Sequence, residues 1–224
     1  MSETETKEHV DTRESLLDAA ESLFSEHGLA AASLRAITQQ AGVNLAAVSY
    51  HFGSKEGLVR AVFSRRLKPL NDERKEMLEA CDLTAADALE QVLRAFLVPA
   101  VRMIRDAPEG VHGFGRLMGR VFSEPNEEVR RVVFAEFKET VDRFMAAFRV
   151  LLPHLSPEEL TWRFHFVAGS MAHTIGCGQM LEELSGGVCR FANVDDALAY
   201  LESFLSAGLR APAAAGRPQC SQGD

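Results

Sequence analysis

The chain has 224 residues, of which 46% are hydrophobic and 25% are charged, and its formal net charge is −8. This size and composition are ordinary for a globular protein with one large domain or two small ones. No run approaches the roughly 20 apolar residues of a membrane-spanning helix, and the polar N-terminus lacks a signal-peptide core, so we expect a cytoplasmic protein without a membrane partner. The four scattered cysteines form no C-x-x-C pair, and we expect neither a metal site nor another cofactor.

The charges are unevenly distributed along the chain. Residues 1–34 carry a net charge of −6, residues 35–68 carry +5, and the remaining residues carry −7. A cationic segment in an anionic protein is typical of a localised phosphate-binding surface. A solvated basic helix face gives the same pattern, so charge alone leaves both interpretations open.

The first helix is expected to begin at a capping pattern, Asp11 followed by Glu14, and to end at Gly28. Its apolar residues recur at helical spacing between these two points. We expect residues 1–11, which precede the pattern, to be disordered.

Two short helices and one long helix are expected next. Ser33 can cap a helix that ends near Gly42, and Asn44 can cap a helix of about two turns. After a break at Gly53 and Ser54, the pattern predicts a long helix over residues 55–80.

The second half of the chain also has helical punctuation. Ser156, followed by a proline and two acids, is a strong helix start. No segment shows sustained strand alternation, so we expect an all-α fold, and the Pro/Gly-rich tail over residues 209–224 is expected to be disordered. The helices expected here cover residues 84–105, 111–122, 126–152, 156–183 and 195–205.

Residues 33–52, SLRAITQQAGVNLAAVSYHF, have the pattern of a helix-turn-helix motif. In this motif the first turns of the second helix approach base edges in the major groove, and neighbouring residues contact phosphates. An αα-hairpin without DNA binding is the alternative. The candidate DNA-binding residues are Ser33, Arg35, Asn44, Leu45, Ala46, Ser49, Tyr50, His51 and Lys55.

The run from Ser33 to Phe63, with its core AGVNLAAVSYHFGSKEGLVRAVF, resembles the signature of the TetR family of transcriptional regulators. The preceding segment LLDAAESLFSEHGLAAASLRAI is similar to that family too, so the resemblance covers about the first 65 residues. Many members have Tyr where this chain has Ser49 and a variable residue where it has Tyr50, so base contacts do not transfer at these positions. The segments NLAAVSYHFGSK, FGRLMGRVFSEP and LPHLSPEELTWRFHF resemble a PsrA-like, fatty-acid-responsive branch.

The resemblance implies a division of the chain. It implies a three-helix DNA-binding domain over 12–54, a linking helix over 55–80, and a helical ligand-binding and dimerisation domain over 81–208. The implied partners are a palindromic double-stranded operator, a second copy of the chain, and a small apolar effector such as a long-chain fatty acid or acyl-CoA. The implied function is a ligand-responsive regulator, expected to be a repressor.

The helix after Ser156 is apolar on two sides. One side carries Phe164 and Val167, and the other carries Trp162 and Phe166. A helix of this kind packs against its own core and against something else, which the resemblance implies to be a partner subunit.

Bulky apolar residues are abundant after residue 84. Most fit a plain core, but they also fit an elongated apolar pocket inside a helical bundle. Two arginines and a histidine could bind the head group of a ligand there. The candidate ligand-binding residues are Phe114, Met118, Arg116, Arg120, Phe122, Phe137, Trp162, Phe166 and His173.

Two other classes of function are considered. No catalytic or phosphate-binding motif of a common enzyme class is present, so we do not expect an enzyme. A helical adaptor that binds only proteins would explain the acidic balance. It would not explain a basic segment beside a helix-turn-helix pattern.

Overall fold

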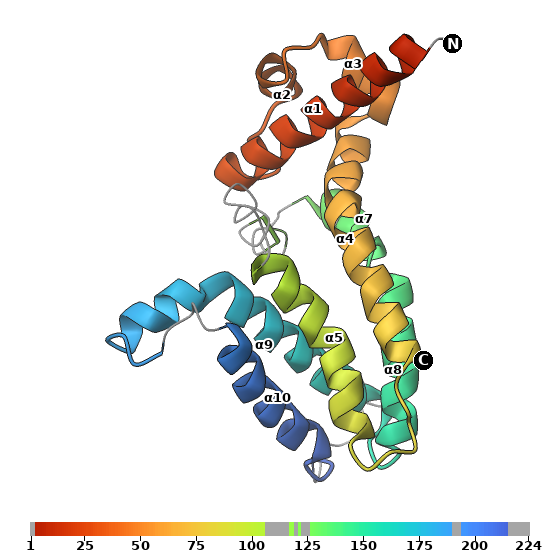
Figure 1. Cartoon of the computed structure of the whole chain (residues 1–224), viewed down its shortest axis with the longest axis vertical. Helices are drawn as coiled ribbons and strands as arrows, with labels where there is room; N and C mark the ends of the chain where they lie inside the picture. Colours follow the sequence, from red (N-terminus) through yellow and green to blue (C-terminus); the bar gives the residue numbers. More distant parts are fainter. Residues whose placement is uncertain (1–2, 106–116, 119–120, 122–125, 190–193, 215–224) are drawn as a thin grey trace, which may run out of the picture.

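The computed structural model describes residues 3–105, 117–118, 121, 126–189 and 194–214, and every element in these ranges is a helix (Figure 1). This confirms the all-α expectation. A three-helix unit lies at one end of the long helix α4, and the remaining helices form a larger unit along the rest of α4, some packed on α4 itself and some on its neighbours. None of the described helices has the length and apolarity needed to cross a membrane.

The three-helix unit consists of α1 (Glu3–His27), α2 (Leu34–Gln40) and α3 (Leu45–Phe52). The predicted caps of the two short helices are present. The Ser33 hydroxyl accepts a hydrogen bond from the Ala36 N–H at 3.1 Å, and the Asn44 side chain accepts one from the Ala47 N–H at 3.0 Å. Each cap satisfies a backbone donor that a helix leaves unpaired at its start.

Helix α1 begins eight residues before the predicted start at Asp11. The expectation of disorder over residues 1–11 is therefore wrong for residues 3–11. The preceding sequence TETKEHV contains no glycine or proline, and its glutamates and lysine have high helix propensity. The capping pattern at Asp11 and Glu14 thus lies inside a continuous helix.

Helix α4 (Lys55–Glu79) begins at Ser54, whose hydroxyl accepts from the Gly57 N–H at 3.1 Å. Gly57 lies against the end of α3, where a Cβ atom would come within 2.0 Å of the Phe52 carbonyl oxygen. Only glycine permits this approach, which sets the angle between α3 and α4.

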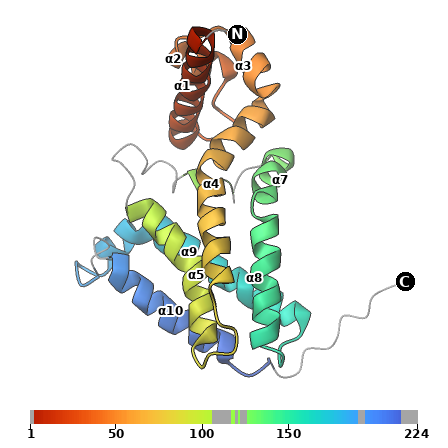
Figure 2. The same cartoon turned by 45° about the vertical axis from the view of Figure 1, so that its right-hand side comes forward.

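The larger unit contains α5 (Ala88–Arg105), α7 (Glu127–Ala135), α8 (Lys138–Leu151), α9 (Pro157–Leu184) and α10 (Val194–Arg210). Figure 2 shows α7 and α8 along one side of α4, while α9 and α10 lie on the side of α5. Helix α5 begins later than predicted, because the N–H and hydroxyl of Thr84 both donate to the Asp82 carboxylate and hold a turn there. The helix expected over 111–122 falls mostly outside the described residues.

The single helix predicted over 126–152 is two helices, α7 and α8, separated by Glu136 and Phe137. The side-chain amide of Asn71 on α4 donates to the Glu136 carbonyl at 2.8 Å. That carbonyl is therefore engaged by a side chain at the point where the helix is interrupted. The apolar periodicity continues across the break, which is why the sequence indicated one helix.

Helix α9 begins as predicted, with the Ser156 hydroxyl accepting from the Glu159 N–H at 3.1 Å and Pro157 in the first position. It ends at Leu184, before Gly186 and Gly187, which both have positive φ angles.

The predicted tail begins too early. Leu209 is buried and α10 continues to Arg210, because Arg163 on α9 donates to the carbonyls of Leu209, Ala211 and Pro212 at 2.7–2.9 Å. Residues 215–224 lie outside the described part of the chain.

Candidate nucleic-acid interface and regulatory unit

The two faces of α3 differ sharply. Val48 is buried in the core of the three-helix unit, as predicted, and Ala47 packs beside it. Leu45 and Tyr50 are exposed, Tyr50 by 73%, although both could pack in a core. The exposed residues on and next to this face are Asn44, Leu45, Ala46, Ser49 and Tyr50.

The helix before it contributes polar groups. Arg35 on α2 is exposed, and Ser33 is exposed at the cap. Gln39 and Gln40 are also exposed, at the end of α2, and the sequence reasoning did not select them. The sequence could have indicated the exposure of Gln39, because helical spacing places it away from the side of α2 that carries the buried Ile37.

His51 and Lys55 are half-buried at the junction of α3 and α4. The His51 ring contacts the Tyr50 ring edge-on, with centroids 5.0 Å apart. The Lys55 ammonium donates to the Ala30 carbonyl at 3.3 Å, which ties α4 to the loop before α2 and leaves two further N–H donors on that ammonium. All nine predicted DNA-binding residues thus lie on α2, on α3, at the caps of these helices or at the first residue of α4, and seven of them are exposed.

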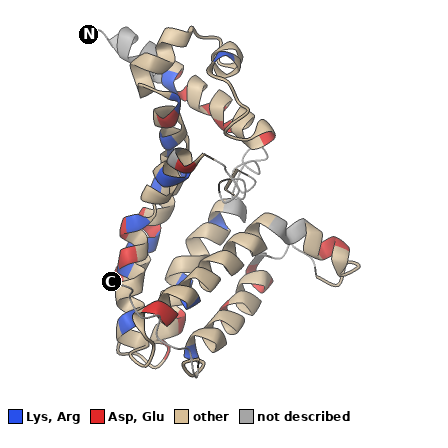
Figure 3. Ribbon diagram, turned by 180° about the vertical axis from the view of Figure 1, so that it is seen from behind, with Lys and Arg blue, Asp and Glu red and all other residues tan. Residues whose placement is uncertain are grey.

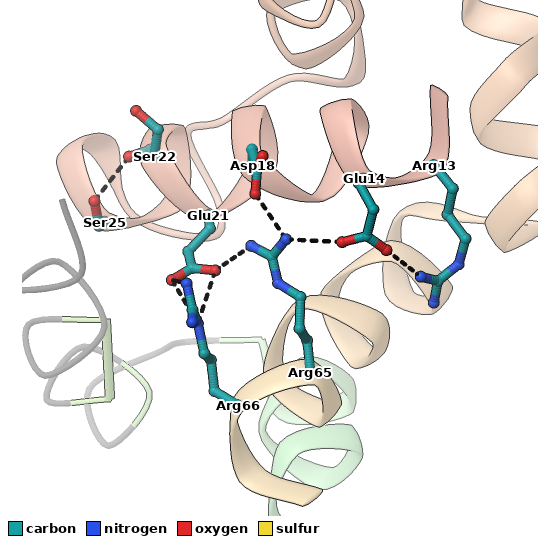
Figure 4. Close-up of polar contacts among 8 residues, drawn as sticks. All are labelled: Arg13, Glu14, Asp18, Glu21, Ser22, Ser25, Arg65 and Arg66. Carbon is teal, nitrogen blue, oxygen red and sulfur yellow. Dashed lines mark hydrogen bonds and ion pairs between the residues drawn. The ribbon is translucent and has the colours of Figure 1, made fainter. Parts of the chain in front are cut away.

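Not all the basic residues of the 35–68 segment are available to a ligand. Figure 4 shows Arg65 and Arg66 of α4 bound to three acids of α1. Arg65 donates to Asp18 at 2.7 Å and to Glu14 at 3.3 Å, and it also donates to Glu21. Arg66 binds the same Glu21 carboxylate, with a shortest contact of 3.1 Å.

This network fixes α1 on α4. Glu21 is buried and accepts from both arginines, so it compensates two guanidinium groups that are themselves partly buried. The negative charge of α1 and part of the positive charge of the next segment thus neutralise each other within the fold, and Figure 3 shows both signs of charge on α4.

We expect Glu21→Ala to lower the free energy of unfolding by about 2 kcal/mol, because it leaves Arg65 and Arg66 without their shared acceptor. Asp18→Ala removes an exposed partner of Arg65 and is expected to cost under about 1 kcal/mol. Urea denaturation at one fixed protein concentration measures both. Equal effects of the two substitutions would contradict the assignment of Glu21 as the central acceptor.

The five predicted ligand-binding residues that the structure describes are not brought together. Met118 and Phe137 are half-buried and pack against the core cluster around α4. Trp162, Phe166 and His173 are exposed on the outer face of α9, opposite buried Phe164 and Val167, so in the single chain they lie on the surface and not in an interior pocket. The remaining four lie outside the described residues: Phe114, Arg116, Arg120 and Phe122.

Exposed aromatic residues are present on α9 and on its neighbour α10. Trp162 and Phe166 are neighbours on α9, with ring centroids 6.0 Å apart, and Tyr200 and Phe204 on α10 are 79% and 71% exposed. The two apolar sides predicted for this helix are thus present, one buried and one open. Adjacent exposed aromatic residues of this kind mark an interaction surface.

The sequence reasoning missed Arg74. This arginine lies in the charged run NDERKE of α4, yet it is among the largest fully buried side chains of the protein. A signal was available, because Leu67, Leu70 and Arg74 follow one another at helical spacing on the buried face of α4.

Two family models match the chain. The model described as bacterial regulatory proteins, tetR family, matches residues 16–62, and the model described as tetracyclin repressor-like, C-terminal domain, matches residues 94–208. The second match alone covers just over half of the chain. The chain belongs to the TetR family.

Known proteins resemble the chain over most of its length. The HTH-type transcriptional regulator BetI of Rhizobium meliloti (strain 1021) is 26% identical over 199 residues, which are 89% of this chain and 90% of that protein. The fatty acid degradation regulator FadR from Bacillus halodurans has a TM-score of 0.65 at 16% identity and covers 89% of this chain and 96% of its own. SmeT, in its complex with triclosan, has a TM-score of 0.61 at 21% identity, with 92% and 98% covered. At these identities the two structures show the fold alone.

The matched families and relatives are transcriptional regulators and not enzymes. TetR-family regulators bind operator DNA through the N-terminal helix-turn-helix, form homodimers, and typically respond to small molecules in the C-terminal domain. This TetR-family chain has the exposed helix face and the second, helical unit that such a regulator requires.

Proposed function

We propose that the protein is a cytoplasmic repressor that binds a palindromic operator as a homodimer and releases it when a small, largely apolar effector binds. The observation that carries this proposal is the exposed face of α3, where the large side chains of Leu45 and Tyr50 are open to solvent. The side chains of Ser33 and Asn44 cap α2 and α3 and so fix the start of each helix. In the dimer, two α3 helices would contact half-sites about 34 Å apart, or a multiple of that distance.

Helix α4 connects the effector to the DNA. Its first turns are buried in the three-helix unit through Leu58 and Val62, and its later turns are buried in the larger unit through Leu70 and Arg74. The ion pairs of Arg65 and Arg66 with Glu21 make α1 follow α4. An effector that favours a different position of α4 would therefore change the spacing of the two α3 helices in the dimer. This requires that the effector binds the protein with α4 in that position better than it binds the DNA-bound protein.

Our first candidates for the effector are long-chain fatty acids and their acyl-CoA thioesters. The resemblance of NLAAVSYHFGSK to a PsrA-like branch supports this choice, and the Bacillus halodurans neighbour is a regulator of fatty acid degradation. The core around α4 includes the half-buried methionines Met103, Met118 and Met171, which adapt to flexible apolar chains.

The test is a gel shift on fragments upstream of the protein's own gene, with and without a panel of fatty acids and acyl-CoAs. We expect specific, salt-sensitive binding that one acyl species releases. Specific binding that no member of the panel disturbs would contradict the lipid effector and leave the repressor. Weak, salt-insensitive binding to every fragment would favour a protein-binding adaptor instead.

A further inference from the structure

Arg74 is a charged group enclosed by the larger unit. Its side chain is 1% exposed, and its guanidinium lies over the Phe96 ring of α5, with 4.2 Å from Cζ to the ring centroid. Its Nε donates to the Phe96 carbonyl at 2.9 Å, and Nη2 contacts the Met171 sulfur of α9 at 3.4 Å. Three helices therefore meet at this one side chain.

The charge has no counterion among the residues that the structure describes. The contacts above use two of the five guanidinium N–H groups, and one of them is to a weak sulfur acceptor. Burial lowers the pKa of Arg74 to about 10, so the group remains protonated at neutral pH. A buried positive charge without an acid is unfavourable, and an anion that reached it would be bound strongly.

A second polar group lies one turn earlier on the same buried face of α4. Asn71 uses its amide N–H to bind the Glu136 carbonyl, while its own carbonyl oxygen is buried without a hydrogen-bond partner among the described residues. Arg74 therefore offers donors, and the Asn71 oxygen offers an acceptor, on one buried face of α4. The hydrophobic core cluster that contains Leu67 and Leu70 of α4 also includes Ala100, Met103, Val133, Phe137, Met171 and Ile175.

We propose that Arg74 binds the carboxylate of an apolar-chain acid and is thereby the anchor of the effector site. The inference rests on the proposed function, because it names the class of effector that acts on α4. It favours a free acid over its acyl-CoA thioester. In the thioester the carboxylate is lost, and the phosphates lie too far from the acyl chain to reach a guanidinium buried beside apolar residues.

The position of Arg74 also explains how binding would be transmitted. Arg74 lies nine residues after Arg65 on the same helix, or about 13 Å along the axis, and the helix continues through Pro69, which lacks one backbone N–H donor, between them. A new ion pair at Arg74 would act on the helix that carries the ion pairs to α1 (Figure 4).

The experiment compares three probes with the same ten-carbon chain, namely decanoate, 1-decanol and decyltrimethylammonium, and adds octanoate, dodecanoate and hexadecanoate to cover chain length. Binding to the full chain is measured by calorimetry. We expect the acid to bind at least about 10-fold more tightly than the alcohol, and the cation not to bind. Arg74→Met is expected to weaken acid binding by about 10- to 100-fold and to leave alcohol binding unchanged.

Two controls distinguish the loss of an anion-binding group from a general effect on charge or folding. Arg149→Met removes an exposed arginine of α8 and should leave acid binding unchanged. The Arg74→Met variant should melt at or above the wild-type temperature, because the substitution replaces a buried unpaired charge by an apolar side chain of similar length. A melting temperature well below the wild type would show that Arg74 is structural and would overturn the proposal.

Other outcomes also separate the inference from the proposed function. Equal binding of acid and alcohol, undiminished acid binding by Arg74→Met, or no binding of any acid in the series would overturn the anchor. Arg74-dependent acid binding that does not release the operator in the gel shift would support the anchor and contradict the repressor mechanism. Release of the operator by a neutral ligand, in both the wild type and the Arg74→Met variant, would support the repressor mechanism and contradict the anchor.

Discussion

The Phe204→Glu variant is expected to be a monomer in solution and to bind operator DNA at least about 100-fold more weakly than the wild type. Phe204 is 71% exposed on α10, four residues after the exposed Tyr200, and α10 packs against α9. A carboxylate at the centre of a subunit interface would be buried without a partner, which costs more than such an interface can offset.

The loss of DNA binding follows from geometry. A dimer holds two α3 helices at a fixed spacing, so once one helix is bound the other meets its half-site at a high effective concentration. A monomer lacks this gain in operator affinity. Sedimentation velocity measures the oligomeric state, and fluorescence anisotropy on a labelled operator measures the affinity. Val150→Glu places the same charge on an exposed apolar residue of α8, outside this face, and should change neither quantity. A dimeric Phe204→Glu protein with full affinity would contradict the assignment of this surface.

The Ala46→Glu variant is expected to remain folded and dimeric but to lose specific operator binding by about 100-fold or more. Ala46 is exposed in the first turn of α3, where a small side chain would let the backbone approach DNA. A carboxylate there would face phosphates and base edges, and like charges in contact cost several kcal/mol. The same carboxylate near a helix N-terminus is favourable in the free protein, so stability should not fall.

The measurement is anisotropy over a range of salt concentrations, together with a melting curve. Ala146→Glu makes the same exchange at an exposed position of α8 and is expected to keep wild-type affinity. Unchanged operator affinity in Ala46→Glu would show that α3 is not the helix that enters the groove, and Gln39 and Gln40 of α2 would then be the residues to test.

The local helix signals could be predicted from sequence because each depends on residues a few positions apart. Ser33, Asn44 and Ser156 each accept from a backbone N–H three residues later, and all three caps were predicted. The two apolar sides of α9 were predicted for a similar reason, since helical spacing alone assigns Phe164 and Trp162 to different faces.

The contacts that the sequence could not predict join residues far apart in the chain. Glu21 meets Arg65 across 44 residues, Asn71 meets Glu136 across 65, and Arg74 contacts Met171 across 97. These contacts decided that α7 and α8 are separate, and that two arginines counted as free positive charge are neutralised by α1. In the sequence a charged residue is expected to be solvated.

The sequence by itself thus determined the all-α fold, the helix-turn-helix and the family, because these depend on short-range spacing and on a local motif. Only the tertiary structure decided which of the charged residues are buried, since burial depends on which helices meet. For this reason only the packing of α4, α5 and α9 shows that Arg74, one residue in a charged run, is a buried guanidinium without a counterion among the described residues.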